Sequence, residues 1–176
     1  DSYDKYIWAV VEAFERHIVG VPEKNLLPII RRVNAFHKDR VYRYTRDLVR
    51  DLKRKRYFLV AISHSPKYIV EGFAKRMGFN KVYGRYFELD DKGRFTGKTL
   101  HRDLIDDKSV ILARVVEKEG LTLKGSYGVG DTESDIAFLE MVAHPICFNP
   151  NQSLYRAARR KGWKVIVERK DVIYSI

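Results

Sequence analysis

The chain has 176 residues, and 45% of them are hydrophobic, which is enough for one domain of ordinary size with a small subdomain. Its 34 Lys and Arg residues outnumber 23 Asp and Glu residues, and the formal net charge of +11 favours anionic ligands such as nucleic acid, anionic membrane surfaces or phosphorylated metabolites. No apolar run is long enough to span a membrane, and the one cysteine, Cys147, excludes an internal disulfide and a cysteine-based metal site. We therefore expect a cytoplasmic protein with no membrane partner.

The basic residues are scattered along the chain, without the interleaved aromatic residues that are typical of nucleic-acid motifs. Their densest run, Lys53-Arg54-Lys55-Arg56, falls at the end of an expected helix, where cations complement the helix dipole. The charge pattern therefore does not favour nucleic-acid binding as the main role.

Helical patterns occupy the chain before its first expected strand, over residues 3–18, about 22–38 and about 39–55. The first stripe of apolar residues is Ile7, Val10, Val11, Phe14 and Ile18. The second stripe is Leu26, Ile29, Ile30, Val33 and Phe36. We expect residues 1–40 to form a small helical domain that precedes an α/β core over residues 41–176.

Residues 57–62 form a continuous apolar run, which is typical of a strand buried on both faces. The run ends in Ser63-His64-Ser65-Pro66, and a helix is expected from there to about Met77, with Ser65 as N-cap and Pro66 at the first helical position. The Ser63 hydroxyl and the free amides of the helix start could hold a phosphate. A plain serine-rich turn between strand and helix explains the same residues.

Residues 82–88 and 94–99 flank Asp90-Asp91-Lys92-Gly93, which predicts a β-hairpin with Gly93 at positive φ. A helix is expected over about 107–119, with Lys108 in its first turn, where the helix dipole disfavours a cation. Such a lysine either meets an anion or is an exposed residue of little consequence.

The apolar run 125–129 predicts a strand that ends in Gly130, and carboxylates and then a helical pattern follow it. Open α/β sheets bind ligands at the carboxyl ends of their strands. Asp131 and Asp135 are four residues apart, so they can face one point, and two converging carboxylates suit Mg²⁺. The alternative is structural, with Asp131 or Thr132 capping the helix.

Three further elements complete the pattern: a strand over 144–148, a basic helix over 152–161 and a strand over 164–167. Strands that alternate with helices predict an α/β fold with a parallel sheet and right-handed crossovers.

A strand ending in Ser63, a lysine at a helix start (Lys108) and strand-Gly-Asp131-x-x-x-Asp135, in this order, resemble the haloacid dehalogenase (HAD) superfamily of phosphatases. The stretches FELDDKGRFTGK, YGVGDTESD and NPNQSLYRAARRKGWKVI resemble its phosphoserine-phosphatase-like branch, in which a helical cap follows the first core strand. The resemblance runs from about residue 57 to 167. It implies a Rossmann-like parallel sheet with a β-hairpin and makes residues 1–40 the cap.

The resemblance also implies roles for individual residues. Ser63 would hydrogen-bond a phosphoryl oxygen, with His64 beside it in the phosphate-binding set. Lys108 would neutralise charge on the nucleophile and the phosphoryl group. Asp131 would bind Mg²⁺ directly, and Asp135 would hold a water of the metal or orient Lys108.

The chain departs from the family pattern in one respect, because no Asp-x-Asp-x-Thr motif occurs in its 176 residues. In the family this motif supplies the nucleophile and the general acid/base and ends the first core strand, which lies between the strands ending here at Ser63 and Gly130. Without such a strand, those two would lie about 10 Å apart with unpaired edges. Asp1-Ser2 resembles the sequence just after the motif, so we expect an upstream strand that ends in Asp-x-Asp.

The implied activity is Mg²⁺-dependent hydrolysis of a small phosphorylated metabolite through an aspartyl-phosphate intermediate. Two alternatives stay open at this point. The absent motif permits a catalytically inactive HAD-like domain that binds an anionic partner, and the same chemistry permits a phosphotransferase.

Overall fold

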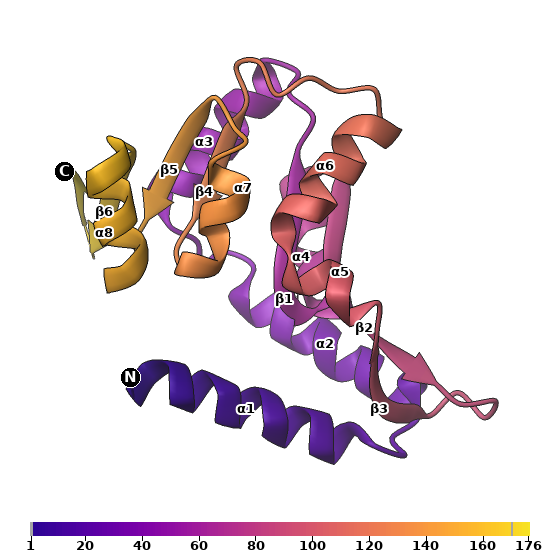
Figure 1. The fold of residues 1–176 in the computed structure, drawn as a ribbon. Helices are drawn as coiled ribbons and strands as arrows, with labels where there is room; N and C mark the ends of the chain where they lie inside the picture. Colours follow the sequence, from indigo (N-terminus) through magenta and orange to yellow (C-terminus); the bar gives the residue numbers. More distant parts are fainter. Residues whose placement is uncertain (1, 170) are drawn as a thin grey trace. The chain divides into compact units, whose positions relative to one another are not determined.

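The computed structural model describes residues 2–169 and 171–176, so Asp1 lies outside the described residues. The chain divides into two compact units (Figure 1), each considered by itself. Unit 1 comprises Asp1–Val41 and Asp51–Arg102, and unit 2 comprises Tyr42–Arg50 and Asp103–Ile176. This division rests on packing alone, and the division into a cap (1–40) and a core (41–176) stays a prediction.

Unit 1 combines helices with a three-stranded sheet of order β1-β2-β3, in which β1 and β2 are parallel and β3 is antiparallel to β2. Its elements are α1 (Ser2–Ile18), α2 (Glu23–His37), β1 (Val60–Pro66), α4 (Lys67–Met77), β2 (Lys81–Leu89) and β3 (Phe95–Leu100). The chain passes from one unit to the other at three places, and one of them falls within α3 (Arg43–Arg54), between Arg50 and Asp51.

The core of unit 1 forms where α1 packs on the hairpin strands. Ile18, Phe87 and Phe95 are each at least 95% buried, and Phe14 packs against them. This confirms the stripe predicted for α1 at Phe14 and Ile18, whereas Val10 of the same stripe is exposed. The stripe predicted for α2 is only partly buried: Ile30 is in the core, whereas Ile29, Val33 and Phe36 are exposed, since periodicity reports the apolar face of a helix and not its partner.

The predicted hairpin is confirmed, and Asp90 shapes its turn. One carboxylate oxygen of Asp90 accepts hydrogen bonds from the backbone N–H groups of Lys92 (2.9 Å) and Arg94 (2.8 Å). Gly93 adopts φ +67°, a left-handed conformation that a glycine takes without strain. The side chain and the glycine together close the loop between β2 and β3.

Unit 2 contains a four-stranded sheet of order β4-β5-β6-β7, in which the first three strands are parallel and β7 is antiparallel. The strands are β4 (Tyr127–Gly130), β5 (His144–Phe148), β6 (Lys164–Arg169) and β7 (Val172–Ser175). The helices after the unit boundary are α5 (Arg102–Asp106), α6 (Lys108–Lys118), the short 3₁₀-helix η1 (Glu133–Asp135), α7 (Ile136–Leu139) and α8 (Gln152–Lys161). The α/β class with parallel strand pairs and a β-hairpin is therefore confirmed, and the antiparallel pairing of β7 with β6, which was not predicted, makes the sheet of unit 2 mixed.

Side chains cover the sheet of unit 2 on both faces. On one face, Cys147 and Val165 pack with Leu139, Leu154 and Ala158 from the helices, and all five are fully buried. On the other face, Ile146, Phe148 and Ile166 pack with Tyr44 and Leu48 of α3. Burial on two faces explains why β5 reads as an apolar run without alternation.

Glu168 of β6 sets the start of α3, which begins at Arg43 and not near residue 39 as predicted. Its carboxylate is almost fully buried and accepts hydrogen bonds from the backbone N–H groups of Arg43 and Tyr44, each at 2.9 Å. These amides belong to the helix start and have no partner within the helix. A glutamate more than 120 residues away in sequence thus supplies the N-terminal cap.

Other boundaries also shift. Strand β1 begins at Val60 and not at Tyr57, and it extends to Pro66. The helix after β4 ends at Leu139, so Val142 packs over Gly128 from a turn and not from a helix as predicted. Helix α5 and strand β7 were not predicted. No helix among the described residues is both long enough and apolar enough to cross a membrane.

Candidate active site

The turn after β4 is built around Asp135, which is 2% exposed. Its Oδ2 atom accepts hydrogen bonds from the backbone N–H groups of Asp131 (2.8 Å) and Thr132 (3.2 Å). A Cβ at Gly130 would lie 2.5 Å from the Cβ of Asp135, so only glycine leaves room for the carboxylate here. Thr132 is the N-cap residue of η1, so the predicted capping and the carboxylate cluster occur in the same turn.

Lys108 reaches this turn from the start of α6. Its Nζ atom lies 2.5 Å from Oδ1 of Asp135, and the side chain is 12% exposed. The interpretation of Lys108 as an exposed surface residue is therefore wrong, because the lysine meets an anion within the protein. Asp107 caps the same helix by accepting hydrogen bonds from the backbone N–H of Ser109 at 2.9 Å and of Val110 at 3.4 Å, and this carboxylate offsets the unfavourable dipole at Lys108.

Asp131 has different surroundings from Asp135. Desolvation in the crowded turn and then the neighbouring charge of Asp135 raise the pKa of Asp131, against an opposing effect of Lys108. A raised pKa means that the negative charge is incompletely compensated by the groups around it. Asp131 therefore has the properties of a hard oxygen ligand for a cation, whereas both oxygens of Asp135 already accept hydrogen bonds.

These residues fit Mg²⁺ as a small ligand set. In the part of the chain that the structure describes, no group of three or more His, Cys, Asp or Glu side chains is arranged to hold a metal ion. Mg²⁺ commonly binds through one or two carboxylates and completes its shell with water and phosphate oxygens. Asp131 could supply one such carboxylate at the carboxyl end of β4.

Ser63 and His64 lie in unit 1, at the carboxyl end of β1. The pairing of β1 with β2 is irregular between Ile62 and Pro66, so the backbone of the intervening residues leaves the regular ladder. The backbone N–H of Ser65 donates to Oγ of Ser63 at 3.1 Å. Pro66, and not Ser65, is the N-cap residue of α4, and the predicted helix start was one residue too early.

The structure brings Lys108, Asp131 and Asp135 together within unit 2, while Ser63 and His64 belong to unit 1. The roles assigned to all five residues stay predictions.

Sequence reasoning missed Asn151, which supports the acidic turn. Its backbone N–H donates to the carbonyl oxygen of Asp131 at 2.8 Å, and its Nδ2 group donates to Glu133. Its Oδ1 atom also caps α8 by accepting from the N–H of Leu154 at 2.9 Å. The Asn-Pro-Asn sequence after β5 was the available signal, but it indicated only a turn.

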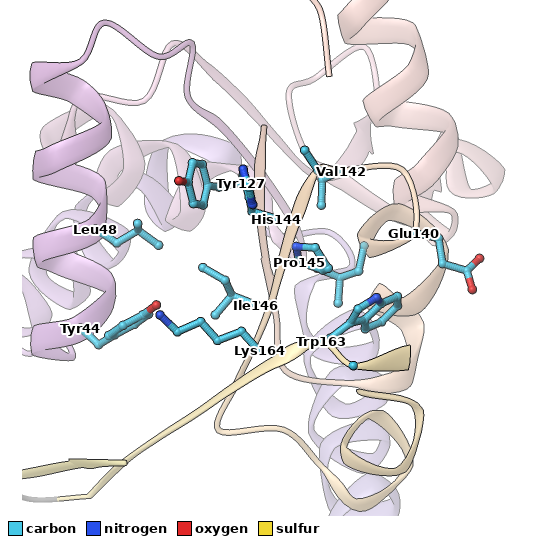
Figure 2. A pocket seen from close by; sticks show the side chains of 13 residues that line it. Tyr44, Leu48, Tyr127, Glu140, Val142, His144, Pro145, Ile146, Trp163 and Lys164 are labelled. Carbon is cyan, nitrogen blue, oxygen red and sulfur yellow. The ribbon is translucent and has the colours of Figure 1, made fainter. Parts of the chain in front are cut away.

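A separate cavity of about 650 Å³ opens at the amino ends of β4, β5 and β6 in unit 2 (Figure 2). Tyr127, His144 and Lys164, the first residues of these strands, line it together with Tyr44 of α3. Nζ of Lys164 lies 5.6 Å from the centre of the Tyr44 ring. Because Asp131 follows the opposite end of β4, the cavity is distinct from the acidic turn.

The structure thus has an α/β fold with a carboxylate turn at the end of a parallel strand and a lysine from the preceding helix, and open α/β sheets bind ligands at such strand ends. A family model described as haloacid dehalogenase-like hydrolase matches residues 6–140. The match covers most of the chain, so the chain belongs to this family, and its relatives place it in the phosphoserine-phosphatase-like branch.

Curated relatives match over part of their length. The chain is 27% identical over 141 residues to a phosphoserine phosphatase of Archaeoglobus fulgidus, covering 79% of this chain and 39% of that protein. It is 27% identical over 111 residues to a histidinol-phosphatase of Neisseria meningitidis, covering 61% and 50%, respectively. It is 28% identical over 108 residues to an "Inhibition of morphological differentiation protein" of Streptomyces azureus, covering 61% and 39%. The chain thus spans half or less of these relatives.

Solved structures support the fold. A protein of unknown function from Bordetella pertussis matches with a TM-score of 0.73 at 21% identity, covering 88% of this chain and 71% of that chain. A phosphoserine phosphatase with an analogue of its phospho-aspartyl intermediate matches with a TM-score of 0.57 at 21% identity, covering 72% and 58%. At this identity the likeness establishes the fold alone.

Proposed function

We propose that the protein is a Mg²⁺-dependent phosphomonoesterase that acts on a small phosphorylated metabolite through an aspartyl-phosphate intermediate. The observation that carries the proposal is the Lys108–Asp135 ion pair at 2.5 Å beside Asp131, at the carboxyl end of β4 in a HAD-family chain. Phosphoryl transfer depends chiefly on positioned cations and hydrogen-bond donors, and this turn holds such a cation in place.

Each residue has one proposed task. Lys108 offsets negative charge on the nucleophile and the phosphoryl oxygens, and Asp135 fixes its position by holding Nζ with one oxygen and the turn with the other. Asp131 binds Mg²⁺, which when bound supplies further positive charge to the phosphoryl group. Ser63 donates its hydroxyl hydrogen to a phosphoryl oxygen, with His64 and the amides at the start of α4 alongside.

The nucleophilic Asp of this proposal lies upstream of residue 1, at the end of a further strand. Within the described residues, β1 and β4 are edge strands of their sheets, each with a single neighbouring strand. Exposed strand edges with unpaired backbone groups readily accept another strand. A strand that pairs with β4 in parallel would bring an Asp-x-Asp sequence to the carboxyl end of β4, where Asp131 follows.

The names of relatives agree with this class of activity. Two of the proteins described above are named as phosphatases of small phosphorylated compounds, phosphoserine and histidinol phosphate. We extend to this chain only the common element, a phosphomonoester of a small metabolite. We also propose a cytoplasmic location, and burial of the free Cys147 is compatible with a reducing compartment.

A catalytically silent HAD-like domain that binds an anionic partner is the second candidate. The observation in its favour is that the 176 residues contain no Asp-x-Asp-x-Thr motif, although their net charge is +11. A phosphotransferase would use the same residues and differ only in the acceptor of the phosphoryl group.

The test is the rate of 4-nitrophenyl phosphate hydrolysis by the full-length protein, with and without Mg²⁺. We expect Mg²⁺-dependent hydrolysis that Asp131→Ala abolishes and that the exposed hairpin substitution Asp91→Ala leaves unchanged. A normally folded full-length protein without hydrolysis would favour the silent domain. Faster release of 4-nitrophenol in the presence of added alcohols, with phosphorylation of the alcohol, would favour the phosphotransferase.

A further inference from the structure

We propose that Arg85 is a positioning residue that couples helix α1 to the turn Ser63–Lys67, so that docking of α1 sets the shape of this turn and its affinity for phosphate. The phosphate-binding part rests on the function proposed above, whereas the coupling rests on contacts within unit 1 alone. The contacts converge on three consecutive residues of β2: Gly84, Arg85 and Tyr86.

Arg85 is a buried cation that forms an ion pair with a residue of α1. Its side chain is 6% exposed, and its Nη1 atom lies 3.1 Å from Oε1 of Glu15, whose side chain is 25% exposed. A buried charge is tolerated when a paired charge and hydrogen bonds compensate it, and removal of one partner leaves the other in an unfavourable environment. The position of α1 therefore determines whether the guanidinium of Arg85 keeps its ion pair with Glu15.

The packing of α1 places Glu15 beside β2. Phe14 and Ile18, on either side of Glu15 in the helix, pack against Phe87, and the Phe14 and Phe87 ring centres are 5.6 Å apart. A Cβ at Gly97 of β3 would lie 3.7 Å from the carbonyl oxygen of Glu15 and 2.7 Å from a methyl group of Val19, just after α1, so the end of α1 approaches the hairpin closely. This packing leaves little freedom for Glu15 to leave Arg85 while α1 stays docked.

On its other side, this segment of β2 touches the turn. Arg85 is the register partner of Pro66, directly after the irregular stretch of β1 that contains Ser63. A Cβ at Gly84 would lie 2.7 Å from the Cα of Lys67 and 3.0 Å from the carbonyl oxygen of Ser65. The backbone of β2 and the turn are therefore in close contact, and a displacement of Arg85 would be transmitted to Ser65 and Lys67.

A second link joins the start of α4 to α2. The Tyr68 hydroxyl donates to Oε1 of Glu23 at 2.6 Å, and the Tyr68 ring stacks on Tyr86 with centres 6.1 Å apart. Nζ of Lys67 lies 5.3 Å from the centre of the Tyr86 ring. Each of the two N-terminal helices is thus connected to the turn through a carboxylate. Glu15 of α1 forms an ion pair with Arg85 of β2, and Glu23 of α2 accepts a hydrogen bond from Tyr68 of α4.

The experiment compares Glu15→Gln with Glu12→Gln in the full-length protein. Both positions lie on α1, but Glu12 forms an exposed ion pair with Arg16, with side chains 73% and 70% exposed, and serves as the matched control. Backbone hydrogen exchange is measured separately for residues 9–19 and 63–70, and inhibition by inorganic phosphate is measured with 4-nitrophenyl phosphate as substrate.

We expect Glu15→Gln to accelerate exchange about tenfold in both segments, because the buried Arg85 loses its ion pair with α1. The inhibition constant for inorganic phosphate should rise about tenfold, whereas Glu12→Gln should change neither quantity. Arg85→Lys, which keeps a cation at this position, should retain more phosphate affinity than Arg85→Met. The combined exchange Glu15→Arg with Arg85→Glu should restore protection of residues 63–70 relative to either single substitution.

Unchanged exchange of residues 63–70 in Glu15→Gln, with faster exchange of residues 9–19, would overturn the coupling, because α1 would then loosen without affecting the turn. Equal effects of Glu12→Gln and Glu15→Gln would also overturn it. If the full-length protein hydrolyses no phosphomonoester, the proposed function fails, but the exchange of residues 63–70 still decides the coupling.

Discussion

At the scale of single residues, the two carboxylates of the acidic turn have different tasks although they are four positions apart. Asp135 is buried and compensated by Lys108 and two backbone amides, so its role is to hold other groups. The pKa of Asp131 is raised by desolvation in the turn and by the charge of Asp135. Asp135 therefore organises the turn, and our proposal assigns Mg²⁺ binding to Asp131.

Asp135→Asn tests the organising role. Loss of the charge leaves Lys108 largely buried without its anion, which should lower the free energy of unfolding by about 3 kcal/mol. Equilibrium unfolding in urea measures this, with Glu140→Gln as control, since the Lys161–Glu140 pair is exposed and should contribute less than about 1 kcal/mol. Equal and small losses in the two variants would show that Asp135 does not hold the turn.

The raised pKa of Asp131 predicts a pH dependence for Mg²⁺ binding. As pH falls through this pKa the carboxylate binds a proton, so Mg²⁺ affinity should begin to decline at higher pH than for an ordinary aspartate. Without Mg²⁺, this pKa affects the free energy of unfolding in the opposite direction. A carboxyl group whose pKa is raised in the folded state stabilises the fold at low pH, and this contribution is lost as pH rises through the raised pKa. Mg²⁺ titrations at several pH values measure the first effect, and an identical pH profile in Asp131→Asn would contradict the assignment.

At the scale of elements, contacts between distant residues decide where helices begin and where turns are tight. Asn151 and Glu168 both bind backbone amides at helix starts, and Gly130 leaves space for the carboxylate of Asp135. The cap from Asn151 is local, so α8 was predicted with its observed bounds, 152–161. The cap from Glu168 comes from another strand, which no local pattern indicates, so the start of α3 was predicted about four residues too early.

Glu168→Ala should lower the free energy of unfolding by about 2 kcal/mol, because two amides at the start of α3 lose a buried charged acceptor. Glu117→Ala, at an exposed position of α6, is the control and should change stability by less than about 0.5 kcal/mol. Urea unfolding monitored by circular dichroism compares the two variants. Equal stability of both would remove Glu168 as the determinant of the helix start.

Strand β7 escaped prediction for a physical reason. All four residues of β7 are exposed, so hydrogen bonds to β6 hold the strand and no alternation of apolar residues marks it. Its antiparallel pairing is what makes the sheet of unit 2 mixed. In contrast, β5 was predicted with its observed bounds, His144–Phe148, because its interior position imposes an apolar run that ends at a turn.

At the scale of the whole molecule, the order of the motifs was more informative than any one of them. Ser63, Lys108 and Asp131 each had a plain structural explanation, and their order along an alternating α/β chain identified the family that the comparison then confirmed. The resemblance offered contact with Lys108 as one of two roles for Asp135, and the structure shows this contact. The support from Asn151 and the Glu15–Arg85 pair could not be predicted, because both depend on packing between distant segments. The net charge of +11 adds a general attraction for anionic substrates.

The central claim is that the turn after β4, with Lys108, is the charge-stabilising part of a phosphatase site. The most direct measurement is kcat/KM for Mg²⁺-dependent hydrolysis of 4-nitrophenyl phosphate by the full-length protein, for the natural sequence, Lys108→Ala and Lys118→Ala. Lys118 is an exposed lysine at the opposite end of α6 and serves as the control. We predict a loss of about 10²-fold or more for Lys108→Ala and none for Lys118→Ala. An unchanged kcat/KM in Lys108→Ala, or equal losses in both variants, would contradict the claim.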